Sequence, residues 1–259
     1  MATVINDGPD RVPRFDPLPA EIPRIRDGYM GAVYYGQRRG GDFYDFVRVN
    51  HDRVLFGLFD IAGELETTRP IMIRLQESFR SYGPQLLQTS TANEPESMLE
   101  LWIKLNKVIM KAANGIRSCP AFLGCYNEDV KMLCYVNAGH TPGICRIGSH
   151  TRLLEATALP LGLFSHSIPD SSVIVLGPGN GLLLVSSGVV EAKHKGEEFS
   201  LQRAREYFHK ARFESAHETC VGLLAQVRQF MGTAPTHNDV TSLSLIRPAL
   251  LDEQPGSRG

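Results

Sequence analysis

The spacing of apolar residues changes along this chain and divides it into strand-like and helix-like segments. Runs rich in β-branched and aromatic residues predict the first strands, at 29–36, 42–49 and 53–60. The last two runs are separated by Asn50, His51 and Asp52, which are typical of a hairpin turn. Apolar residues then recur at helical spacing within 67–87, which predicts a helix after the hairpin.

A second helix is predicted for the apolar stripe that starts at Met98 and ends at Ala112, because its members stand three or four positions apart. Asn93 can cap the start of this helix, with Glu96 three residues later, and Gly115 can end it. We interpret the stripe as core packing, since one apolar face is what a helix on the surface of a globular core presents.

The remaining apolar segments predict a second series of strands and two further helices. The strands are expected at 121–127, 132–139, 143–148, 171–177, 181–188 and 240–246, and the helices at 200–211 and 215–231. This order lacks the regular alternation of a parallel α/β fold, so it predicts an α+β fold in which antiparallel sheets carry helices on their outer faces. We expect one domain over 24–247, with an extended arm at 1–23 before it and a flexible tail at 248–259 after it.

Composition narrows the class of protein without changing this picture. Hydrophobic residues make up 42% and charged residues 21% of the 259-residue chain, as in an ordinary globular protein. The net charge is −1 without a basic patch, and no run approaches the ~18 apolar residues of a membrane span, so we expect no nucleic-acid or membrane partner. The first residues lack a secretory signal, which favours a cytoplasmic location. The five cysteines contain no CxxC pair, which argues against zinc and against a disulfide framework.

Two carboxylates stand where predicted strands meet loops. Asp42 follows two glycines, and Asp60 ends an apolar run. Taken alone, Asp42 is more typical of a turn or cap, and Asp60 could be a solvated strand end. The partnership of the two acids favours a functional site over these structural roles.

Six segments carry a family resemblance: GGDFYDF, DIAGEL, NAGHTPGI, LPLGLF, LLLVSSGVVEA and NDVTSLSLI. In this order and spacing they resemble the sporulation stage II E branch of the type-2C metal-dependent protein phosphatases, over residues 40–246. The resemblance implies a four-layer αββα sandwich of two antiparallel sheets flanked by helices. It also implies two Mn²⁺ or Mg²⁺ ions at one end of the sandwich, and hydrolysis of a phosphoserine or phosphothreonine ester by water without a covalent enzyme intermediate.

The resemblance implies catalytic and metal-binding roles for a small set of oxygen donors. Asp60 is similar to the bridging carboxylate of the family, the carbonyl of Ile61 to its backbone ligand, and Asp42 to the acid that holds water at the metals. Asn238 completes the expected metal ligands. Gly63 would let the backbone close around the ions without a side chain in the way.

The chain departs from the family pattern at two of the expected ligands. In the triplet Ser186, Ser187, Gly188 the central serine stands where the family has a carboxylate, and Asn238 replaces another acid. The site could therefore bind two ions, one or none, because cation affinity depends on the number of charged ligands. Glu64 stands where family members usually have histidine.

Other side chains could support the site, and the sequence leaves their roles open. Asp239 could replace the missing acid only if a bulge turned it toward the metals. Glu64 and Glu191 are candidate surrogates, although Glu191 could equally face solvent or serve a structural role. His140 could act as a general acid, but a hydrogen-bonded turn is more typical of its NAGH segment.

Two functions follow from these assignments. The first is a phosphatase that acts on a phosphorylated bacterial regulatory protein, such as an anti-sigma-factor antagonist. The alternative is an inactive pseudophosphatase that binds a phosphoprotein or serves as a scaffold in a partner-switching pathway, which the residues at 187 and 238 favour. A metal-free hydrolase built on His140 and Ser186 or Ser187 ranks last, because no nucleophile elbow or ordered triad accompanies them. The oligomeric state stays open.

Overall fold

The computed structural model describes residues 16–35, 41–112, 118–233 and 238–249, and these form two five-stranded sheets. The first sheet has the strand order β1 (Tyr29–Tyr35), β12 (Val240–Ile246), β9 (Gly181–Val185), β6 (Gly143–Ile147) and β7 (His150–Leu154). The second has the order β2 (Gly41–Arg48), β3 (Arg53–Ile61), β4 (Ala121–Asn127), β5 (Met132–Ala138) and β8 (Ser172–Val175). Neighbouring strands run antiparallel throughout both sheets.

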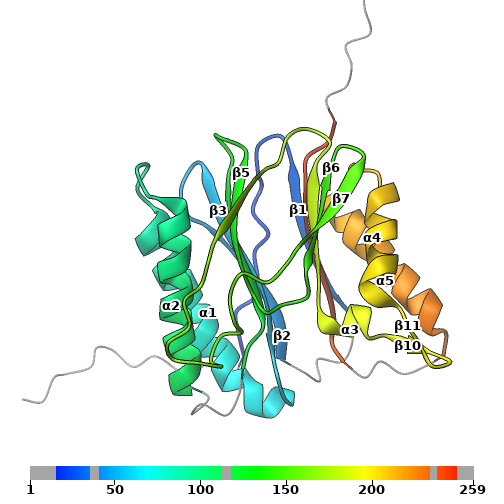
Figure 1. Cartoon of the computed structure of the whole chain (residues 1–259), viewed down its shortest axis with the longest axis horizontal. Helices are drawn as coiled ribbons and strands as arrows, with labels where there is room; N and C mark the ends of the chain where they lie inside the picture. Colours follow the sequence, from blue (N-terminus) through cyan, green and yellow to red (C-terminus); the bar gives the residue numbers. More distant parts are fainter. Residues whose placement is uncertain (1–15, 36–40, 113–117, 234–237, 250–259) are drawn as a thin grey trace, which may run out of the picture.

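Helices cover the outer face of each sheet (Figure 1). The second sheet carries α1 (Leu65–Leu87) and α2 (Glu94–Ala112), and the first carries α4 (Ser200–Lys210) and α5 (Ala216–Met231). Three short elements follow β9, namely α3 (Ser187–Val190), β10 (Lys193–His194) and β11 (Glu197–Glu198). The four layers confirm the predicted α+β sandwich of antiparallel sheets flanked by helices. None of the helices in the described ranges is both long and apolar enough to cross a membrane.

Strand alternation decides which side chains enter which layer of the sandwich. In β2 and β3, Phe46, Phe56 and Leu58 face the first sheet, where they join a cluster that includes Leu184 of β9 and Leu243 of β12. These side chains are nearly inaccessible to solvent. The two sheets are therefore held face to face by an apolar layer contributed by both.

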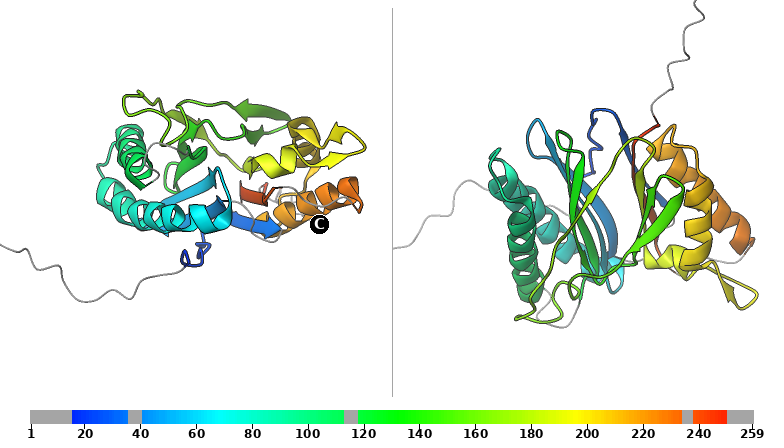
Figure 2. Two further views of the ribbon diagram at one scale, coloured as in Figure 1. Left: turned by 90° about the horizontal axis from the view of Figure 1, so that it is seen from below. Right: turned by 45° about the horizontal axis from the view of Figure 1, so that its top comes forward.

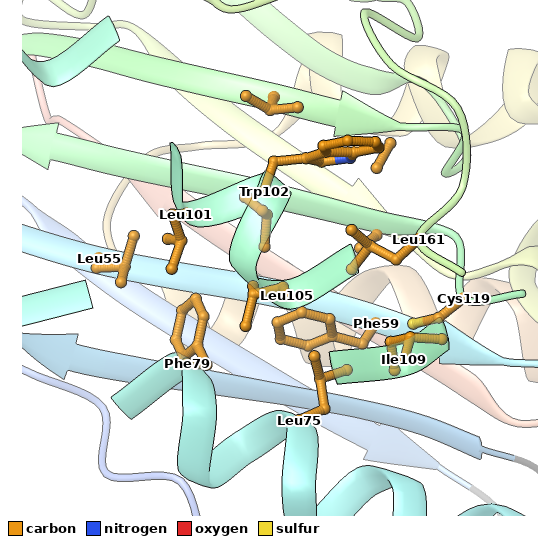
Figure 3. Close-up of a cluster of buried hydrophobic side chains, with 14 of the residues drawn as sticks. Leu55, Phe59, Leu75, Phe79, Leu101, Trp102, Leu105, Ile109, Cys119 and Leu161 are labelled. Carbon is orange, nitrogen blue, oxygen red and sulfur yellow. The ribbon is translucent and has the colours of Figure 1, made fainter. Parts of the chain in front are cut away.

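The intervening residues of β3 face the helices and form a second cluster (Figure 3). Leu55 and Phe59 lie against Phe79 of α1 and Leu101 of α2 in this view. Trp102, at the centre of the predicted apolar stripe, is fully buried there. Interpretation of that stripe as core packing is confirmed.

Most predicted elements differ from the observed ones by one to three residues at their ends. Asn93 accepts a hydrogen bond from the Glu96 N–H at 3.5 Å, and Ser215 accepts one from Glu218 at 3.2 Å. Four observed elements were not predicted, namely β7, α3, β10 and β11. The last two have only two residues each. The β7 segment is short, polar and largely exposed, and α3 has only four residues, so neither produces a clear apolar period.

Some expectations fall partly or wholly outside the described residues, including Gly115 as the end of α2, residues 1–15 of the arm and residues 250–259 of the tail. The described part of the arm packs on α1. There the side chain of Gln76 bonds both backbone groups of Leu18, at 2.7 Å to its N–H and 2.8 Å to its carbonyl. The domain limits at 24 and 247 stay predictions.

A charge pair joins α1 to the helix-facing side of β2. The side chain of Asp45 is fully buried, and Arg80 contacts it with two nitrogens, at 2.7 Å from Nε to Oδ2 and 2.8 Å from Nη2 to Oδ1. Hydrogen bonding to Asp45 raises the pKa of Arg80. Because the fork satisfies both carboxylate oxygens, the pair fixes the position of α1 on the sheet.

We predict that Arg80→Met destabilises the fold by about 3 kcal/mol, because it leaves the Asp45 carboxylate buried without its partner. Urea unfolding followed by circular dichroism measures the loss. Arg74→Met is the matched control, since Arg74 is an exposed arginine on the same helix, and it should change stability by less than about 0.5 kcal/mol. Equal losses for the two variants would contradict a special role for the pair.

Candidate metal centre

Two carboxylates face each other at one end of the layer between the sheets. Asp42 is the direct antiparallel partner of Asp60 in the β2–β3 register. Both positions continue the alternating set that faces the first sheet, and Asp42 is only 5% exposed. Like charges placed opposite each other on one sheet face destabilise it, so this pairing needs compensation.

Hydroxyl groups from the other side of the sandwich contact both carboxylates. Thr241, on β12, donates to Asp42 Oδ2 at 3.0 Å, and Ser187, the first residue of α3, donates to Asp60 Oδ2 at 2.9 Å. Ser186 accepts from the Thr241 N–H at 3.0 Å and donates to the Asp239 carbonyl at 3.1 Å. The site is thus assembled across the sandwich, at the lower end of the view in Figure 1 where α3 lies.

Asn238 and Asp239 point to different surroundings. Asp239 is buried, and Tyr34 of β1 donates its hydroxyl to Asp239 Oδ1 at 2.6 Å. Asn238 is exposed and donates its amide nitrogen to Glu191 Oε2 at 3.1 Å. Of the two, Asp239 lies close enough to Asp42 to affect its ionisation, although the sequence favoured its neighbour as the ligand.

The electrostatic state of Asp42 reflects this crowding. Burial is the largest influence and raises the pKa of Asp42 well above its usual value, and the charges of Asp60 and Asp239 act in the same direction. Hydrogen bonds from Ser186 and Thr241 oppose the rise without reversing it. A full negative charge on Asp42 is therefore unfavourable unless a cation or a proton accompanies it.

The end of β3 and the loop to α1 contain three of the predicted site residues. Ile61, the last residue of β3, lies opposite Gly41, and its carbonyl oxygen takes up the space that a Cβ atom on Gly41 would need. Gly63 has a φ of 129°, a conformation that side-chain-bearing residues rarely adopt. Glu64 is exposed at the N-cap of α1, and its carbonyl accepts from Thr68.

A second backbone constraint holds Ser187 in place. A Cβ atom on Gly188 would lie 2.0 Å from the Asp239 carbonyl oxygen, so only glycine allows α3 to approach the start of β12 this closely. This contact keeps the Ser187 hydroxyl within reach of Asp60. Gly188 thus supports the site by packing, without a chemical group of its own.

The charge of Asp60 also contributes to the pKa values of two buried side chains, His140 and Cys119. His140 is buried, its backbone N–H donates to Asn137 Oδ1 at 2.8 Å, and its Nδ1 lies 3.1 Å from the Thr141 carbonyl. Its Nε2 makes no hydrogen bond within the described residues, and burial lowers its pKa. Burial raises the pKa of the Cys119 thiol, so this cysteine is not an activated nucleophile.

The donor set fits one divalent cation better than two. Asp42 and Asp60 would supply carboxylates and Ile61 a carbonyl, and Mg²⁺ commonly binds one or two carboxylates and keeps several waters. The described residues contain no group of three or more His, Cys, Asp or Glu side chains arranged to hold a metal ion. Ser187 and Asn238 are neutral and both donate hydrogen bonds to acids, so neither restores the negative charge of a carboxylate ligand.

Sequence reasoning missed Tyr34 and Thr241 and assigned Ser186 no part in the acidic site. Tyr34 and Thr241 are direct partners in the β1–β12 register, and Thr241 stands two residues after Asp239. A period of two along the last strand could have indicated that Asp239 and Thr241 share a face. Nothing local in the sequence indicates Tyr34, which is more than 200 positions away from Asp239.

The sequence of this chain matches a known protein family. The family described as Stage II sporulation protein E (SpoIIE) matches residues 50–248. Phosphoserine phosphatase RsbP of Bacillus subtilis (strain 168) is 26% identical over 172 residues, which are 65% of this chain and 41% of RsbP. This chain therefore matches less than half of the length of that relative.

Solved structures share the fold at low identity. The SiaA-PP2C domain of Pseudomonas aeruginosa aligns with a TM-score of 0.69 at 16% identity, over 83% of this chain and 84% of that one. RsbX in complex with magnesium aligns with a TM-score of 0.61 at 11% identity, over 87% of this chain and 98% of RsbX. Because the family match covers most of the chain and the sandwich is common to these structures, the chain belongs to the SpoIIE family of PP2C-type phosphatase domains.

Proposed function

We propose that this chain is a metal-dependent protein serine/threonine phosphatase with a reduced site that binds one Mg²⁺ or Mn²⁺ ion and turns over slowly. The observation that carries the proposal is the facing pair Asp42 and Asp60, buried between the sheets and contacted by hydroxyls from the opposite side. The magnesium complex of RsbX supports the choice of cation. RsbP, a phosphoserine phosphatase, supports the choice of reaction.

The roles of this chain's residues follow from their contacts. Asp42 and Asp60 would bind the cation together with the Ile61 carbonyl, while Thr241 and Ser187 orient the two carboxylates. A divalent ion in such a site supplies a lowered pKa for coordinated water and neutralises charge on the phosphoryl oxygens. Without the ion, Asp42 retains a proton more readily because its pKa is raised.

The alternative function is a pseudophosphatase that binds a phosphoprotein without hydrolysing it. Two contacts favour it: Ser187 occupies Asp60 Oδ2, and Asn238 directs its amide nitrogen to Glu191. Either function fits a partner-switching pathway in which the partner is a phosphorylated regulatory protein, such as an anti-sigma-factor antagonist. A cytoplasmic location follows from such a partner and belongs to the same proposal.

We predict that the double variant Ser187→Asp, Asn238→Asp hydrolyses p-nitrophenyl phosphate at least about tenfold faster than the native chain in Mn²⁺. The reason is that two added carboxylates raise the negative charge available to a second cation. Phosphate release is measured across a Mn²⁺ titration for both proteins. Asp60→Asn in either background should abolish the signal, because it removes the shared carboxylate.

The result separates the two functions. Weak native turnover that depends on Mn²⁺ and is lost in Asp60→Asn supports the phosphatase. No native turnover and no heat of Mn²⁺ binding by calorimetry, together with a gain in the double variant, would favour the pseudophosphatase. Rapid native turnover that survives Asp60→Asn would contradict the metal mechanism and the assignment of the site.

We also predict that Asp42→Asn raises the melting temperature at neutral pH in EDTA. The folded pKa of Asp42 is above its unfolded value, so the protonated form favours folding at low pH and this benefit is lost as pH rises through the folded pKa. Asparagine keeps the acceptor for Thr241 and removes the charge, with a gain of roughly 2–4 °C for each kcal/mol of relieved repulsion. The gain should shrink as the pH falls, because Asp42 with its raised pKa is then increasingly protonated in the native chain.

Thermal unfolding at several pH values, with and without Mg²⁺, tests this. Mg²⁺ should stabilise the native chain and have little effect on Asp42→Asn. Asp129→Asn is the control, because Asp129 is exposed in the β4–β5 turn at the far end of the sheet. A gain of equal size at every pH would show that charge repulsion at Asp42 is not its cause.

A further inference from the structure

A groove outside the acidic site runs between the edge strand β1 and the helix α5. Its cavity has a volume of about 490 Å³, and its lining is mainly apolar. Val33 and Tyr35 of β1 form one wall, and Val221, Leu224, Ala225 and Arg228 of α5 form the other. We call this feature the β1–α5 groove. Figure 2 shows β1 and α5 at the same edge of the molecule in its left view.

The strand beside the groove, β1, stands at the edge of its sheet among the described strands. Within the described ranges β1 is the first strand in the order of its sheet and pairs only with β12. An edge strand offers backbone hydrogen-bonding groups to an added strand, and a neighbouring pocket can receive one of its side chains. Both walls are accessible to solvent, since Tyr35 of β1 is 41% exposed and Val221 of α5 is 38% exposed.

Charge indicates which kind of strand fits. Arg228 is the only charged residue among the described residues that line the groove, and its guanidinium lies 5.9 Å from the centre of the Tyr35 ring. Among the described residues no acidic side chain lines the groove, so an occupant that carries a carboxylate would complement Arg228. A second copy of this chain that paired to β1 through its own β1 would bring no carboxylate to Arg228, because the strand sequence YMGAVYY contains no acidic residue, so a partner segment that carries one matches this charge better.

We propose that the β1–α5 groove is a docking site for an extended segment of a partner protein, which adds to β1 as a strand. The segment places an apolar side chain between Tyr35 and Val221 and a carboxylate against Arg228. This docking does not depend on the metal or on phosphatase activity. The docked segment would lie next to β1, and Tyr34 of the same strand donates its hydroxyl to Asp239 beside the acidic site.

A displayed library of random peptides, selected against the full chain in EDTA, tests the proposal. We expect enriched peptides in which apolar β-branched or aromatic residues alternate with polar ones and include Asp or Glu. A synthetic peptide of the enriched sequence should slow amide hydrogen exchange in β1. Its affinity should fall at least about tenfold for Val221→Glu and for Arg228→Glu, and replacing its acidic residue by Lys should restore binding to Arg228→Glu.

Val130→Glu is the matched control, since Val130 is also an exposed valine and lies in the β4–β5 turn. It should bind the peptide as the native chain does, and all three variants should keep the native melting temperature within a few degrees. The absence of an enriched acidic, alternating motif would overturn the proposal. So would binding that is insensitive to Val221→Glu and Arg228→Glu, or self-association of the chain through β1 in place of peptide binding.

Discussion

The register of β2 against β3 is the constraint on which the acidic site depends, because it makes Asp42 and Asp60 direct partners on the face between the sheets. A shift of one residue would turn one of these side chains toward the helices and separate the pair. The register is fixed along its length by residues such as Phe46 and Phe56, which face each other in the apolar layer between the sheets. Packing far from the carboxylates thus determines their geometry.

The same alternation explains why the site spans two sheets. The apolar layer becomes polar at one end, where hydroxyl groups of Thr241 and Ser187 contact the carboxylates of the second sheet. On the opposite face of β2, Arg80 compensates the buried charge of Asp45 with two hydrogen bonds. Strand β2 therefore carries two acids in different surroundings. Asp45 is neutralised by an arginine, whereas among the described residues Asp42 receives hydrogen bonds only from neutral hydroxyl groups. In the proposed metal site, Asp42 with its raised pKa is therefore the position where a cation would relieve the most unfavourable charge.

The sequence was sufficient for features that depend on local periodicity or on neighbouring motifs. Alternating and helical spacing predicted the sheets and the helix that contains Trp102, and the order of short motifs indicated the family. Contacts between distant strands could not be predicted in this way. Tyr34 reaches Asp239 because β1 pairs with β12, which no local pattern reveals. Asp239 was expected to need a bulge on the assumption that Asn238 faces the metals. Asp239 instead stands two residues before Thr241, which bonds Asp42, so the alternation of an extended segment is enough to bring it near Asp42.

Ser187 illustrates how a neutral residue can replace a charged ligand in geometry but not in electrostatics. Its hydroxyl satisfies one oxygen of Asp60 as a hydrogen-bond donor, so the acid is not left without a partner when no ion is bound. A neutral donor cannot cancel the negative charge that Asp60 and Asp239 impose on Asp42. If the proposed ion binds at this pair, it competes with the proton on Asp42 for the same excess charge, and a rise in pH favours the ion. In the proposed site, the raised pKa of Asp42 and the affinity for a cation both follow from the same uncompensated negative charge.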